Sequence, residues 1–177
     1  MTSRTALIVI DMQVALFDGA HRIANVSGNV RALASRARAA DVPVIYLQHC
    51  HDRYNEMMKG QPGWQIHPDV GRVDGDLVVE KTASDSFYRT SLHDTLQGLG
   101  VTKLAVTGMQ TEFCVDATCR AALSHGYDVM LVSDGHTTAD SLLPAQQIID
   151  YHNFLLPRLA HPTHSLRCAP GAEIEFR

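Results

Sequence analysis

Short apolar runs alternate with segments of helical periodicity along the whole chain. The runs are apolar at almost every position, and they lie at residues 5–10, 44–47, 77–79, 104–107 and 129–132, with a weaker candidate at 164–168. Continuous apolarity over a short run, without alternation, is typical of parallel strands that helices cover on both faces. The pattern therefore predicts a mostly parallel sheet of about six strands.

Between these runs, apolar residues recur at the three- and four-residue spacing of an α-helix. The stripes lie at 26–37, 92–99, 115–123 and 148–156. Ser91 is suited to be the N-cap of the second stripe, and Gly100 ends it. Strands that alternate with helices predict an α/β fold, a doubly wound, three-layer α/β/α (Rossmann-like) arrangement. No repeat or linker divides the chain, so we expect residues 1–177 to form a single domain.

The region 49–75 breaks this regularity, because it is polar, rich in Gly and Pro, and holds the only tryptophan. Loops of that length in compact domains are usually functional. Phe17, in the first loop, and Trp64 are candidates for the walls of a substrate pocket. Trp64 has an equal alternative, as an anchor at an oligomer interface.

Composition and charge narrow the classes of partner. The chain has 45% hydrophobic and 19% charged residues, as an ordinary soluble globular protein has, and its formal net charge is −4. This leaves no basic surface for nucleic acid and no Lys/Arg-rich amphipathic helix for a membrane surface. The first apolar run is too short for a signal peptide or a membrane span. We expect a small-molecule partner, with no nucleic acid and no membrane.

The cysteines indicate the redox compartment. They number four, at irregular spacing, in a chain large enough to fold without disulfides: Cys50, Cys114, Cys119 and Cys168. We expect reduced thiols and a cytoplasmic protein.

Three residues of different chemistry follow predicted strands. Asp11 comes directly after the first strand, Lys81 ends the third, and Cys114 stands where the helix after the fourth begins. Ligands of such sheets bind outside the carboxyl ends of the strands, so the three side chains are expected to converge. Their ordinary alternatives are a turn former, a solvated lysine and a packed core thiol. Cys119, on the apolar stripe of the same helix, is interpreted as packing.

The ordinary pKa values of Asp11 and Cys114 do not favour proton transfer from the thiol to the carboxylate. With reference pKa values near 3.9 and 8.5, moving the thiol proton to the carboxylate costs about 6 kcal/mol. A helix N-terminus and a nearby Lys81 ammonium are expected to lower the thiol pKa. Burial is expected to raise the carboxyl pKa. Together these effects would close much of the gap.

Three segments carry a family resemblance. They are LIVIDMQ at 7–13, VVEK at 78–81 with Ser86 and Phe87 following, and GMQTEFCV at 108–115 with RAA at 120–122. In this order and spacing they resemble the isochorismatase-like cysteine hydrolases, which include nicotinamidases and N-carbamoylsarcosine amidases. The resemblance extends over nearly the whole chain, and the block 108–115 is its most specific part.

The resemblance implies roles for individual positions. Cys114 would be the nucleophile, Asp11 the base that takes its proton, and Lys81 the group that orients Asp11. It also implies a cis peptide between Met109 and Gln110, with the backbone N–H groups of Gln110 and Cys114 forming an oxyanion hole. The reaction would cleave an amide, carbamoyl or cyclic amide bond through a thioester, in a homo-oligomer (dimer or tetramer), without an organic cofactor.

A metal site is not expected. The stretch 49–52 (HCHD) is rich in ligand types, and nicotinamidases resembling this chain carry a metal here through an Asp-x-His pair and a later His. In this chain His49 stands at the Asp position, and the later His has no convincing counterpart. We therefore predict no metal at His49 and His51, and this departure also argues against nicotinamidase activity.

Other functions stay open at this point. Some relatives hydrolyse the enol ether of isochorismate, and the same fold could serve as a non-catalytic small-molecule-binding or thiol-sensor protein with Cys114 as its reactive group. A dinucleotide-binding protein is disfavoured, because DMQV at 11–14 stands where a G-x-G-x-x-G motif would follow the first strand.

Overall fold

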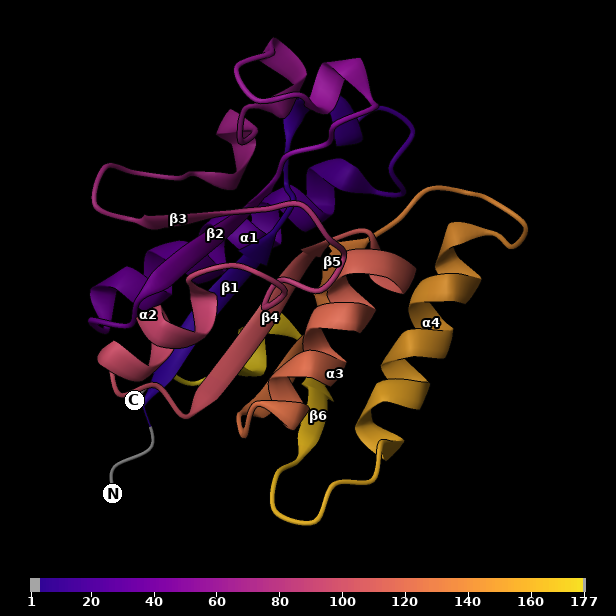
Figure 1. The fold of residues 1–177 in the computed structure, drawn as a ribbon. Coiled ribbons are helices and arrows are strands. Elements are labelled where there is room, and N and C mark those ends of the chain that lie inside the picture. Colours follow the sequence, from indigo (N-terminus) through magenta and orange to yellow (C-terminus); the bar gives the residue numbers. More distant parts are fainter. Residues whose placement is uncertain (1–3, 177) are drawn as a thin grey trace.

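The computed structural model describes residues 4–176, and six strands form one sheet in the order β3-β2-β1-β4-β5-β6 (Figure 1). The strands are β1 (Thr5–Ile10), β2 (Val44–His49), β3 (Leu77–Lys81), β4 (Lys103–Met109), β5 (Asp128–Thr137) and β6 (Leu166–Ala169). Every neighbouring pair in this sheet is parallel. The predicted α/β fold with about six strands is therefore confirmed.

Helices cover both faces of the sheet, which explains the continuous apolarity of the central strands. The helices are α1 (Ile23–Ala39), α2 (Leu92–Gly98), α3 (Asp116–Ser124) and α4 (Ala145–Leu155). Leu7 and Val9 of β1 pack in one core with the apolar stripe of α1. Ile8 and Ile10 belong to a second core, which includes the apolar residues of α2 and α3. The three layers are visible in Figure 1.

The strand order reverses between β1 and β4. From β1 the chain builds outward to β2 and β3, and then returns to place β4 on the other side of β1. The carboxyl ends of β1 and β4 therefore flank the point where such sheets bind ligands. Gly108 pairs with Ile10 here at φ +116°, and a Cβ atom on Gly108 would lie 2.1 Å from the Ile10 carbonyl oxygen. Only glycine permits this close approach of β4 to β1.

Some local details differ from the predictions. A π-helical turn (Thr111–Val115) precedes α3, so Cys114 lies before that helix and not in its first turn. Ser91 occupies the N-cap position of α2 without a side-chain cap, and the Thr90 hydroxyl accepts the Leu92 N–H instead. The region 49–75 contains three 3-10 turns, Asn55–Met57, Pro62–Trp64 and Pro68–Val70. Among the described helices, none has the length and apolarity needed to cross a membrane.

Candidate active site

The structure brings Asp11, Lys81 and Cys114 together at the carboxyl edge of the sheet. Asp11 follows β1 at φ +49°, a left-handed conformation that Asp tolerates better than most residues. Lys81 ends β3, and its ammonium lies 2.7 Å from Oδ2 of Asp11 and 3.2 Å from Sγ of Cys114. The Lys81 and Asp11 side chains are 0% and 2% exposed. A thiol, a carboxyl group and an ammonium are thus close together at one edge of the sheet.

Lys81 has more acceptors around it than it has protons. Besides Asp11 and Cys114, its Nζ contacts the carbonyl oxygen of Ala83 at 3.0 Å and Nδ1 of His49 at 3.1 Å. An ammonium group has three N–H donors and no acceptor, so one of the four neighbours is always without a donor from Lys81. The ammonium can therefore shift its hydrogen bonds toward whichever neighbour carries the negative charge.

His49 was not foreseen as a neighbour of Lys81. It is the last residue of β2 and pairs with Lys81 across the β2–β3 ladder. The sequence holds the signal for this contact, because both residues end adjacent strands at the edge where Asp11 lies.

Asp11 is placed to accept the Cys114 proton. Burial raises the pKa of its carboxyl group, and the Lys81 ammonium offsets part of that rise. Oδ2 is paired with Lys81, whereas Oδ1 is buried without a hydrogen-bond partner among the described residues. An unpartnered buried oxygen is costly in a structural role, and here it leaves Asp11 with a free acceptor.

The Cys114 thiol does not have the low pKa that its position suggested. Burial, and then the negative charge of Asp11, raise its pKa to about 12, and Lys81 lowers it only in part. Lys81 lowers the thiol pKa as expected, but burial and the charge of Asp11 outweigh it, so the net lowering expected from the sequence is not found. Near neutral pH Cys114 is therefore a thiol beside the Asp11 carboxyl group.

This protonation state predicts an optical titration. The difference in ultraviolet thiolate absorbance between the wild type and Cys114→Ala should be absent at neutral pH and rise only in strongly alkaline solution, toward the pKa of about 12. Because the folded pKa lies above the unfolded value, Cys114 contributes stability that is lost as pH rises past the unfolded pKa. A thiolate signal already complete at neutral pH would contradict this description.

A cavity of about 820 Å³ opens beside these residues. It is lined by residues that follow three strands: 49–52, 82–84, Gln110 and Phe113. Its volume lies within the range of about 300–1,000 Å³ that small-molecule sites usually have. The cavity adjoins the site because His49 and Ala83 both contact Lys81.

Gln110 connects the cavity to the turn that holds Cys114. The peptide bond between Met109 and Gln110 is cis. The Gln110 carbonyl accepts the N–H groups of Phe113 and Val115, and its own N–H donates to no group in the described part of the chain. An unbonded N–H at the cavity wall is available to an oxygen of a bound molecule.

Residues 5–162 match the family model of the isochorismatase domain. The chain belongs to the isochorismatase family. A streptothricin hydrolase of Streptomyces noursei is 40% identical over 138 residues, which are 76% of this chain and 55% of that protein. The chain thus spans about half the length of this curated relative.

Solved structures of the isochorismatase family share the fold. An isochorismatase from Pseudomonas putida superposes with a TM-score of 0.88 at 27% identity, over 97% of this chain and 90% of that one. The N-carbamoylsarcosine amidase of Thermoplasma acidophilum gives a TM-score of 0.78 at 25% identity, over 97% and 99% of the two chains.

Phe17 and Trp64, the residues proposed from the sequence as pocket walls, are not among the residues that line the cavity of this isochorismatase-family chain. Phe17 stacks on His67, with ring centroids 3.7 Å apart. Trp64 donates its indole N–H to Sγ of Cys50, which does line the cavity. Trp64 therefore contacts a residue of the cavity wall, Cys50, and does not line the cavity itself.

The donor set fits a metal ion poorly. One ligand atom each from Asp11, His49 and Cys114 lie within 4.8 Å of one another, but the Lys81 ammonium contacts all three groups. A metal at that point would have to displace a buried cation. The imidazoles of His49 and His51 both use Nδ1 as an acceptor, whereas a metal-ligating histidine donates through its second nitrogen. The residues present do not suit the metal that nicotinamidases resembling this chain carry here.

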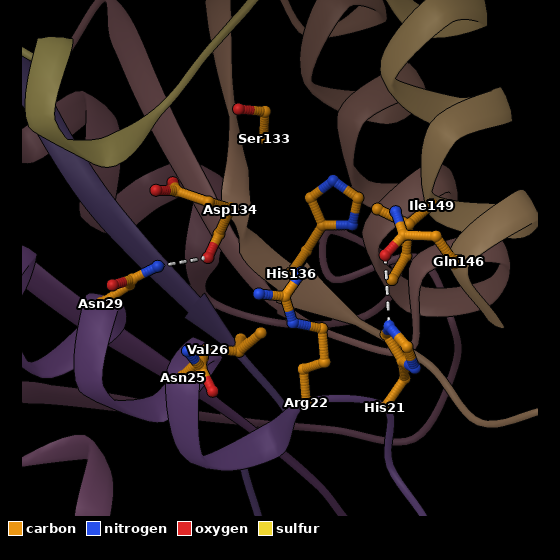
Figure 2. Close-up of a pocket in the computed structure, with 10 residues that line it drawn as sticks. All are labelled: His21, Arg22, Asn25, Val26, Asn29, Ser133, Asp134, His136, Gln146 and Ile149. Atoms are coloured by element: carbon orange, nitrogen blue, oxygen red, sulfur yellow. Dashed lines mark hydrogen bonds between the residues drawn. The ribbon is translucent and has the colours of Figure 1, made fainter.

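Figure 2 shows a second hollow, of about 290 Å³, between the first turns of α1, the end of β5 and α4. Buried His136 lies in its wall, and its ring bonds to the Thr111 hydroxyl (2.8 Å) and to Oδ1 of Asn153 (2.9 Å). Burial lowers the pKa of His136 to about 4, so the ring is neutral near pH 7. Thr111 begins the turn that carries Cys114, so His136 braces that turn. Sequence reasoning assigned no role to this residue.

Proposed function

We propose that this chain is a cysteine hydrolase that cleaves an amide, carbamoyl or cyclic amide C–N bond of a small molecule. The observation that carries the proposal is the geometry around Cys114, where the thiol lies next to a buried carboxylate with a free oxygen and an ammonium at 3.2 Å. Two relatives of the isochorismatase family support the bond type by their names, a streptothricin hydrolase and an N-carbamoylsarcosine amidase.

The first half-reaction forms a thioester. Cys114 passes its proton to Oδ1 of Asp11 while Sγ attacks the carbonyl carbon, so a C–S bond forms and the carbonyl oxygen becomes an oxyanion. The backbone N–H groups of Gln110 and Cys114 would bind this oxyanion, and each such donor is worth about 3 kcal/mol of barrier. The tetrahedral species then collapses, the C–N bond breaks, and Asp11 returns the proton to the leaving nitrogen.

The second half-reaction regenerates the thiol. Asp11 takes a proton from a water molecule while the water oxygen attacks the thioester carbon. The C–S bond then breaks, and Asp11 passes the proton to Sγ of Cys114. The products are a carboxylic acid (or a carbamic acid, from a carbamoyl compound) and the free thiol. The negative charge alternates between Asp11 and Cys114 during the reaction. The Lys81 ammonium can direct its hydrogen bonds to whichever group is charged, because it has four acceptors nearby and only three N–H donors.

A substrate panel tests this function. Wild-type protein should release ammonia or amine, together with an equal amount of acid, from at least one of a set of amides, carbamoyl compounds and cyclic imides. An enol-ether hydrolase would release no ammonia from these compounds and would cleave an isochorismate-type ether instead. A thiol sensor would turn over neither.

The setting of the enzyme is part of the same proposal. We propose a single domain that works in the cytoplasm, and the four cysteines are free thiols in the structure, which supports a reducing compartment. A homo-oligomer, dimer or tetramer, is supported by large apolar side chains at the surface: Leu142 (97% exposed), Leu143 (49%), Tyr151 (57%) and Phe154 (57%). Exposed apolar groups of this size are usually covered by a partner.

A further inference from the structure

Two imidazoles stand together in the wall of the cavity beside Cys114. His49 ends β2 and His51 follows two residues later, and their ring centroids are 5.8 Å apart. Both residues line the cavity. The hydrogen bonds at Nδ1 of each ring determine which nitrogen is left to face a bound molecule.

In His49, Nδ1 lies 3.1 Å from the Lys81 ammonium. Because an ammonium can only donate, a proton on Nδ1 would set two donors against each other, so the neutral ring has its lone pair on Nδ1 and its proton on Nε2. Burial, helped by the Lys81 charge, lowers the pKa of His49 to about 4, so the ring is neutral near pH 7. Nε2 of this partly buried residue has no hydrogen-bond partner in the described part of the chain and is not among its fully enclosed unpaired atoms, and the residue lines the cavity.

The neutral His51 ring has the same tautomer, for a different reason. Its Nδ1 accepts two backbone N–H groups, from Arg53 at 3.0 Å and from Tyr54 at 2.9 Å. Nδ1 therefore carries no proton, and in the neutral ring the proton is on Nε2. The neighbouring Asp52 carboxylate is 85% exposed and lies 3.7 Å from Nδ1, away from the Nε2 donor.

We propose that His49 and His51 form a pair of N–H donors that binds an acceptor oxygen of the substrate, a carbonyl or carboxylate oxygen beyond the scissile bond. The inference rests on the proposed function and narrows its substrate class. The favoured substrates are amides that carry a second oxygen group on the part of the molecule that lies against residues 49–52. The pair selects for that group, while Asp11 and Cys114 carry out the cleavage.

Nitrogen NMR of the histidine side chains tests the donor pair without any substrate. His49 and His51 of the wild-type chain should both show the Nε2–H tautomer at neutral pH. His161 is the matched control, because its Nδ1 also accepts two backbone N–H groups, from Thr163 and His164. A proton on Nδ1 of either cavity histidine, or a switch to that tautomer when Zn²⁺ alone is added, would overturn the inference.

Substrate preference tests the recognition. Pentanamide, levulinamide and succinamate have acyl chains of similar length, and they carry no second oxygen group, a ketone and a carboxylate, respectively. The wild type should prefer one or both of the oxygen-bearing amides by about tenfold or more in kcat/KM, as expected for one or two new hydrogen bonds. Preference for the ketone identifies a carbonyl as the group recognised, and preference for succinamate identifies a carboxylate.

Variants of His49 and His51 test whether the substrate preference depends on these two side chains. His49→Asn and His51→Asn each keep an acceptor near the position of Nδ1 and remove the Nε2 donor. In each variant the preference should fall toward equality, whatever happens to the absolute rate, whereas His161→Asn should keep it. An unchanged preference in both cavity variants would overturn the inference.

The two proposals can fail separately. If the wild type hydrolyses amides through Cys114 but cleaves pentanamide as well as the others, the donor pair is wrong and the cysteine hydrolase stands. If no compound that holds a C–N bond is cleaved, the proposed function fails, and the tautomers of His49 and His51 still decide whether the donor pair exists.

Discussion

Replacing Cys114 with alanine should reduce C–N hydrolysis by more than about a thousandfold and leave the chain folded. In the proposed mechanism the only covalent bond between protein and substrate is made by this thiol, and no other group can replace it. Cys114 is only partly buried, so the truncation costs little packing. The rate of ammonia release in the wild type and the variant, at equal concentration, measures the effect.

Cys119→Ala is the matched control for this loss. Cys119 is fully buried in the core on the same helix–turn segment and takes no part in the site. Its truncation should lower the free energy of unfolding by about 1 kcal/mol and leave kcat within a few fold. Amide turnover that survives in Cys114→Ala would refute the proposed mechanism, whatever the control shows.

Replacing Lys81 with methionine is expected to lower the free energy of unfolding by about 3–5 kcal/mol at neutral pH. The change leaves Asp11 buried without the cation that lies 2.7 Å from its Oδ2 in the wild type. Methionine fills much of the same volume, so lost packing is a small part of the cost. Urea unfolding of the wild type and the variant measures the difference.

The loss in Lys81→Met should depend on pH. Without Lys81, burial alone acts on Asp11 and raises its pKa further above the unfolded value of about 3.9. A group whose folded pKa is raised destabilises the fold progressively as pH rises from the unfolded pKa to the folded one. The variant should therefore come closest to the wild type in mild acid and differ most near neutral pH.

A double variant separates the ion pair from packing. Asp11→Asn with Lys81→Met removes both charges, and it should recover much of the stability that the single Lys81 change loses. If Lys81→Met costs the same in the wild-type chain and in the Asp11→Asn variant, the buried charge is not the source of the loss.

The fold was predictable because its strands are buried on both faces. Each residue of β1 is fully or almost fully buried, alternately against α1 and against α2 and α3, so apolarity is continuous along the strand. The end of β5 was not predicted, because the strand continues to Thr137 through polar residues, beyond the apolar run 129–132. There the hydrogen bonds of His136 and Thr137, which connect distant segments, satisfy the buried polar groups.

The site was predictable to the extent that strand ends revealed it. Asp11 and Lys81 directly end or follow strands, and Cys114 lies in the turn after β4, so topology alone brings them to one edge. The pKa of Cys114 was not predictable, because it depends on the depth of burial and on how close Asp11 lies to the thiol. The contact of Trp64 with Cys50 was not predictable for a similar reason, since it depends on the course of an irregular loop.

During turnover, Cys114 should form a thioester with the acyl part of an amide. Mass spectrometry of the intact protein and of its peptides, after rapid acid quenching, would detect this thioester on any amide that releases ammonia. We expect an adduct with the mass of the acyl group on the peptide that contains Cys114, removed by hydroxylamine and absent in Cys114→Ala. Steady ammonia release from a chain that never carries an acyl group, or carries it at another residue, would rule out the thioester mechanism.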